Sequence, residues 1–150
     1  MKIVKAAALA ASALLASSGA FAAVNPDAVH LALDSLLVAS SKMSVINAMN
    51  KNGKPPATNA EARLGAPSAM TTTEISGIVV NNGVLNVYLA PVTGTDHGLV
   101  QYIPKVITTK KGNKAVEFSC ISPNIPEIAT IASNCVYQPA SQAAGKPPKK

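Results

Sequence analysis

Apolar side chains recur every three or four positions near the start of the chain, which is the spacing of an amphipathic helix. Asn25 is a good N-cap and Pro26 suits the first helical position. Gly53 can end the helix, and Pro55–Pro56 prevents its continuation. We predict one long helix over residues 26–51, about 38 Å at the standard rise, with its apolar stripe facing a core. The stripe consists of Val29, Leu33, Leu36, Leu37, Ser40, Met43, Ile46 and Met49.

Strand-forming residues dominate the chain over residues 74–121. The Asn81–Gly83 segment (Asn-Asn-Gly) is typical of a tight hairpin turn with positive φ angles, and Lys110–Asn113 is a second turn. Strands joined by such short turns must be antiparallel, and the helix is the element that can cover one face of their sheet. We therefore expect an α+β fold with a four-stranded antiparallel sheet. Its strands are Ile75–Val80, Val84–Leu89, Leu99–Thr108 and Ala115–Ile121.

Residues 54–73 join the helix to the sheet and form a polar segment without clear periodicity. A loop of this length is unusual inside a compact domain, and such loops often carry function. We expect a short helical turn within it, near Ala60–Leu64. An inhibitor or small-ligand binder built on this loop is one functional hypothesis.

The first 22 residues have the three parts of a secretory signal peptide. Two lysines precede an apolar run of about 11 residues, which is short for a membrane-spanning helix. An A-x-A pattern then places the cleavage site between Ala22 and Ala23. We expect residues 1–22 to be removed, which leaves a periplasmic or extracellular protein without a membrane anchor. The alternative is an uncleaved anchor helix that extends through Val24.

Cys120 and Cys135 are the only cysteines in the sequence. In an oxidising compartment an even number of cysteines favours a disulfide. This bridge would close the loop of residues 120–135, worth about 3 kcal/mol of stability. Metal binding and redox chemistry are the alternatives, although the two thiols lack further metal ligands and do not form the C-x-x-C pattern of a redox pair.

The formal net charge of +6 suggests an acidic partner such as nucleic acid or a membrane surface. Most of this excess lies outside the predicted domain, so the folded part is close to neutral. Residues 139–150, rich in Pro, Ala, Gly and Lys, are expected to be disordered. Five of the six net charges come from lysines at the chain ends, namely Lys2, Lys5, Lys146, Lys149 and Lys150.

One basic cluster remains within the folded part, formed by Lys105, Lys110, Lys111 and Lys114. On the tip of a hairpin these side chains could contact phosphates, with an affinity that falls steeply with salt. Tyr102 is the nearest aromatic ring, so the cluster lacks the interleaved stacking platform of many single-strand binders. The alternative is a solvated turn whose charges prevent edge-to-edge aggregation.

The sequence shows no pattern of catalytic residues, and we expect no enzymatic activity, cofactor, metal or small-molecule substrate. His30 and His97 are the only histidines. Asp96 precedes His97, but a base and a nucleophile need convergent side chains, which neighbouring residues do not provide. The motifs G-x-S-x-G and H-E-x-x-H and the glycine-rich phosphate loop do not occur in the sequence. Asp96 and His97 are therefore expected to be loop surface.

Several segments resemble, in their order along the chain, parts of the type IV pilin head. Ala48–Pro56 is similar to the helix exit of that family, and Gly77–Val87 looks like its first hairpin. Glu117–Cys120 places an aromatic residue two positions before the first cysteine, as in pilins. Ile125–Pro126 and then Ile131–Cys135 resemble the approach to the second cysteine.

The resemblance covers roughly residues 27–137 and implies a pilin-like domain over residues 23–138 that closes with a C-terminal disulfide loop. It departs from the family at the N-terminus, where Val24 stands in the place of the pilin glutamate and no long apolar stem follows. Phe118 stands where pilins often have tryptophan. Prepilin-type cleavage after Gly19 is the alternative to cleavage by signal peptidase.

The function that the resemblance implies is that of an exported, non-enzymatic structural or interaction protein. It would be a type IV pilus subunit or accessory component with a role in adhesion, and its partners would be other pilus or pilin proteins. Because some competence pilins bind DNA, the alternative is a module that binds DNA during uptake through the four-lysine cluster.

Overall fold

The computed structural model describes residues 23–95 and 97–140. The predicted signal peptide, residues 1–22, and residues 141–150 of the predicted tail lie outside the described residues, so both predictions stay open. The elements in chain order are α1 (Pro26–Leu33), α2 (Leu36–Asn52), the 3-10 turn η1 (Pro67–Ala69), β1 (Ile75–Asn81), β2 (Val84–Leu89), the 3-10 turn η2 (Pro91–Thr93), β3 (Leu99–Thr108), β4 (Lys114–Ser122), α3 (Ile128–Ile131) and β5 (Cys135–Tyr137).

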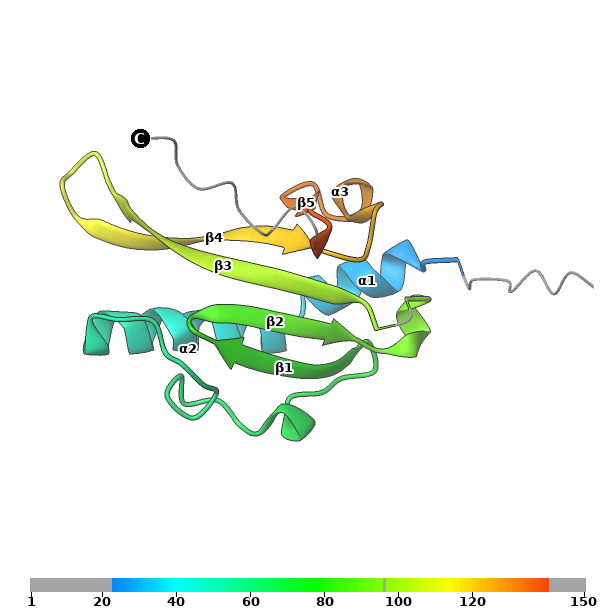
Figure 1. The fold of residues 1–150 in the computed structure, drawn as a ribbon, viewed down its shortest axis with the longest axis horizontal. Helices are drawn as coiled ribbons and strands as arrows, with labels where there is room; N and C mark the ends of the chain where they lie inside the picture. The colour runs from blue at the N-terminus through cyan, green and yellow to red at the C-terminus, as the bar shows by residue number, and fades with distance from the viewer. Residues whose placement is uncertain (1–22, 96, 141–150) are drawn as a thin grey trace, which may run out of the picture.

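The predicted N-terminal helix is present, but it is broken into α1 and α2 (Figure 1). The side chain of Asn25 begins α1 by accepting a hydrogen bond from its first turn, at 3.2 Å. Ser35 begins α2 in the same way, because its hydroxyl accepts a hydrogen bond from the N–H of Val38 at 3.3 Å. The prediction of one continuous helix over residues 26–51 is therefore wrong, since a serine cap in mid-segment competes with the helical backbone.

The break changes which side of α2 faces the core. Leu36, Ser40 and Met43 are exposed, although the predicted stripe places them in the core. Because the backbone is extended at Ser35, the N-cap of α2, the buried side of α2 does not continue the apolar stripe that begins in α1. The buried side of α2 consists of Val38, Ser41, Val45 and Ala48.

The sheet has five strands in the order β1-β2-β3-β4-β5. β1 to β4 form the predicted antiparallel meander, and the φ angles of Asn82 and Gly83, 49° and 83°, fit the predicted turn. β5 lies at the edge and runs parallel to β4. The prediction of four antiparallel strands is therefore wrong, because the segment that contains α3 crosses back and allows a parallel fifth strand.

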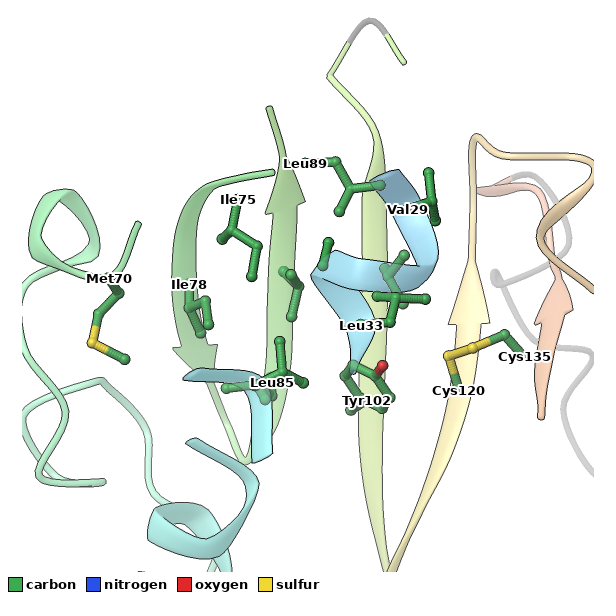
Figure 2. Close-up of a cluster of buried hydrophobic side chains, with 14 of the residues drawn as sticks. Val29, Leu33, Met70, Ile75, Ile78, Leu85, Leu89, Tyr102, Cys120 and Cys135 are labelled. Carbon is green, nitrogen blue, oxygen red and sulfur yellow. A yellow bond between two sulfur atoms is a disulfide. The ribbon is translucent and has the colours of Figure 1, made fainter. Parts of the chain in front are cut away.

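The core lies between the helices and one face of the sheet. Figure 2 shows Val29 and Leu33 of α1 over the strands that carry Ile78, Leu85 and Tyr102. All five side chains are buried. Burial of apolar surface on this scale is the dominant stabilising contribution in a small domain. The α+β class and the packing of an N-terminal helical segment on one sheet face are as predicted.

Cys120 and Cys135 form the predicted disulfide (Figure 2). They are direct partners in the β4–β5 ladder, with their Cα atoms 4.4 Å apart. Both are buried, and Cys120 pairs on its other side with Tyr102 of β3. The bridge therefore fastens the three-residue strand β5 to the rest of the sheet.

By length and composition alone, the helical segment Pro26–Asn52 is apolar enough to cross a membrane. Core helices of soluble proteins and N-terminal signals reach a similar mean hydropathy, and 33% of its most apolar 18-residue stretch is buried in this fold. The expected absence of a membrane anchor therefore stays a prediction.

Candidate functional site

The loop of residues 54–73 lies along the free edge of β1. The side-chain amide of Asn59 donates a hydrogen bond to the carbonyl of Ile78 at 2.9 Å, and its oxygen accepts one from the N–H of Val80 at 2.5 Å. The Asn59 side chain thus makes the two hydrogen bonds that a neighbouring strand would make to β1. Without them, this edge of the sheet could pair with another chain. These contacts give the loop a structural role, and the ligand-binding hypothesis for it remains untested.

The four predicted lysines all lie on the β3–β4 hairpin, which extends past the end of β2 (Figure 1). They do not form one surface. Lys105 pairs across the ladder with Glu117, and Lys114 lies three residues from Glu117 and so on the opposite face. Lys110 and Lys111 occupy the turn, and all four lysines are exposed. The cluster therefore surrounds the hairpin tip, with a carboxylate on one face.

A groove of about 400 Å³ separates the hairpin from the end of α2. Its apolar lining includes Met49, Val106 and Val116, and Lys54 and Lys114 also contribute to it. The fold thus brings one of the four predicted lysines, Lys114, to a concave surface.

Gly83 packs against two prolines that line this groove, Pro55 and Pro104. A Cβ atom at Gly83 would lie 2.7 Å from the Cβ of Pro55 and 3.2 Å from the Cγ of Pro104. The positive φ of 83° also favours glycine there. The turn between β1 and β2 can therefore sit between the two prolines only because position 83 has no side chain.

The solvent-facing side of α2 carries no charge before Lys51 in its last turn. Between residues 36 and 50 the sequence has a single charged side chain, Lys42, which is half-buried. Leu36 is 87% exposed and Met43 is 54% exposed. We define the outer face of α2 as the exposed side chains opposite its buried side, namely Leu36, Ala39, Ser40, Met43, Asn47 and Asn50.

The remaining predicted residues lie apart from these surfaces. His30 Nδ1 is 3.1 Å from the carboxylate of Asp34 on the exposed side of the helix break. His97 has a φ of 55°, and its carbonyl accepts a hydrogen bond from the side chain of Asn124. Within residues 23–95 and 97–140, no three His, Cys, Asp or Glu side chains gather closely enough to hold a metal ion. The expected absence of metal and of catalysis stays a prediction.

No protein-family model matches the chain, and no curated protein matches its sequence.

Sequence reasoning missed the outer face of α2, because it assigned Leu36 and Met43 to the core. The signal that could have revealed it is the single charge between residues 36 and 50. A surface helix normally carries charged residues on the side away from the core.

Proposed function

We propose that this chain is an exported, non-enzymatic structural or interaction protein of the pilin-like type, which joins a pilus assembly as a subunit or accessory component. A role in adhesion is part of the proposal. The observation that carries it is the outer face of α2. That face presents exposed apolar and small polar side chains at the position where a solvated helix would carry charge.

The physical argument concerns the two sides of α2. One side is buried against the sheet and contributes to the core. The opposite side exposes Leu36 and Met43, and hydrating these side chains costs free energy that burial against a second protein would recover. A helix whose outer face is uncharged from Leu36 to Asn50 is suited to a place between its own sheet and a partner.

The order of elements supports the pilin comparison. An N-terminal helical segment, an irregular loop, an antiparallel meander and a C-terminal disulfide follow one another as the resemblance requires. The helix break at Ser35 and the parallel strand β5 are features of this chain that the resemblance did not predict.

Replacing Leu36 and Met43 together by glutamate tests the proposal. We expect the double variant to lose most of the crosslinked adducts that the wild-type protein forms with pilus proteins in whole cells. Its free energy of unfolding should change by no more than about 0.5 kcal/mol, because both side chains are at the surface.

The matched control is Val92→Glu, which adds a charge at a side chain that is 51% exposed outside α2. This variant should keep the adducts. If wild-type protein gives only monomer, with no pilus protein attached, the proposal is wrong. If L36E/M43E crosslinks as well as wild type, the outer face of α2 is not the contact.

DNA binding is the second candidate function, and the projecting β3–β4 hairpin favours it. A filter-binding titration across salt concentrations separates it from the first. If the hairpin contacts phosphates, the Lys110→Ala/Lys111→Ala variant should bind more weakly and lose about one to two units of the salt slope. The control Lys51→Ala, an exposed lysine on α2, should change neither quantity. Absence of salt-dependent binding at low salt would remove this function.

A further inference from the structure

A polar cavity of about 370 Å³ lies beside the break between α1 and α2. It is separate from the outer face of α2 and from the groove at the hairpin. Its walls come from α1, α2, β3, α3 and the segment between α3 and β5. The disulfide ties the end of that segment to β4. Its polar side chains are His30, Asp34, Lys42, Tyr102, Thr130, Ser133 and Asn134.

Lys42 brings a positive charge to this cavity without a close counter-ion. Its ammonium lies 3.6 Å from the centroid of the Tyr102 ring, a cation–π contact. Lys42 forms no ion pair within 4.0 Å with any of the described residues. Asp34 is instead paired with His30. Burial lowers the pKa of Lys42 by desolvation, and the charge of Asp34 opposes this in part. A bound anion would supply the missing counter-charge.

Asp34 contributes the opposite charge at the rim of the cavity. Its side chain is 69% exposed. The negative charge of Asp34 raises the pKa values of Lys42 and Tyr102, although Asp34 forms no ion pair with Lys42. Burial, with a smaller contribution from Asp34, raises the pKa of Tyr102 to about 12, so that its hydroxyl stays protonated at neutral pH. The cavity therefore combines an ammonium and a phenol with a carboxylate that is not in contact with the ammonium.

We propose that this cavity binds a small zwitterion, with the ligand's carboxylate at Lys42 and Tyr102 and its ammonium at Asp34. The ligand class is an α-amino acid. A ligand with only a negative charge would be attracted by Lys42 but repelled by Asp34. A ligand with only a positive charge would be attracted by Asp34 but repelled by Lys42. A molecule with both charges satisfies both groups, and the cavity is at the small end of the ~300–1,000 Å³ range of ligand sites. The site goes beyond the proposed function, and neither depends on the other.

A nuclear magnetic resonance titration of the isotope-labelled protein tests this inference. The probes are glycine, L-serine and L-glutamine, with acetate and methylammonium as the two half-ligands. We expect at least one amino acid to shift the backbone amide signals of residues 130–134 together with those near Asp34 and Lys42. Its affinity should exceed that of either half-ligand by about tenfold, the value of one charge-assisted contact.

Two conservative variants identify the contacts. Lys42→Met keeps an aliphatic chain over Tyr102, and Asp34→Asn keeps the shape of the rim, so both should fold. Each should weaken amino-acid binding by about tenfold, whereas Lys51→Ala, outside the cavity, should not. The inference is overturned if no amino acid shifts these signals at about 10 mM, far above a Kd of ~1 mM. It is also overturned if acetate binds as tightly as the amino acids, or if K42M keeps wild-type affinity.

Discussion

Replacing Cys120 and Cys135 together by alanine is expected to lower the free energy of unfolding by about 3 kcal/mol and the Tm by roughly 10 °C. The bridge closes a loop with a sequence separation of 15 residues, and its loss frees that loop in the unfolded chain. β5 has only three ladder pairs with β4, so the bridge is also its main attachment. Alanine is chosen because both positions are buried.

Urea unfolding with and without a reducing agent measures this effect. Wild-type protein should lose the same stability on reduction, and the double-alanine variant should not respond to the reducing agent. Hydrogen exchange should accelerate in α3 and β5 before the rest of the sheet, because α3 lies within the closed loop and β5 begins at its second cysteine. Equal urea midpoints for reduced wild type, oxidised wild type and the variant would contradict the account.

The substitution Asn59→Ala is expected to cost about 2–3 kcal/mol, since it leaves two backbone groups of β1 without partners. Asn59 is 9% exposed and makes bonds to both Ile78 and Val80. A third bond, to the carbonyl of Gly65, holds the loop itself. Removing the amide therefore uncovers the edge of β1 and loosens its cover at the same time.

Two further variants give this prediction its controls. Asn59→Asp keeps an acceptor for the Val80 N–H but places a carboxylate oxygen against the carbonyls of Gly65 and Ile78, so its cost should be at least that of alanine. Asn47→Ala, at an exposed position of α2, should stay within about 0.5 kcal/mol of wild type. A loss below that value for Asn59→Ala would show that water replaces the side chain and that the loop does not protect the edge.

Local signals predicted much of this fold. Asn25 caps its helix and Gly53 ends it with a φ of 68°, as the sequence indicates. The turn at Asn82 and Gly83 and the four antiparallel strands follow from short-range pattern and turn chemistry. The disulfide followed from the cysteine count together with the expected compartment.

Features that depend on distant contacts could not be predicted in the same way. Ser35 fits a helix interior as well as a cap, and the choice between them decides whether Leu36 is buried. β5 is three residues long, too short for a periodicity, and its partner is set by Cys120. The cavity around Lys42 draws on four parts of the chain, which a linear pattern does not bring together.

The candidate interaction surfaces were predicted only in part. The lysine cluster could be placed on a hairpin from sequence, but its division between two faces required the register that opposes Lys105 to Glu117. Asn59 lies in a loop whose sequence has no periodicity, so no sequence pattern indicates that its side chain bonds to β1. The outer face of α2 was hidden because an exposed leucine and a core leucine look alike in a helical stripe.

Photocrosslinking from the outer face of α2 in whole cells tests the central claim most directly. A photoreactive amino acid at position 43 should form an adduct with a pilus protein or with a second copy of this chain, whereas the same group at position 92 should not. Monomer alone at position 43, under conditions in which the protein is exported and folded, would contradict the proposal that this face binds a partner.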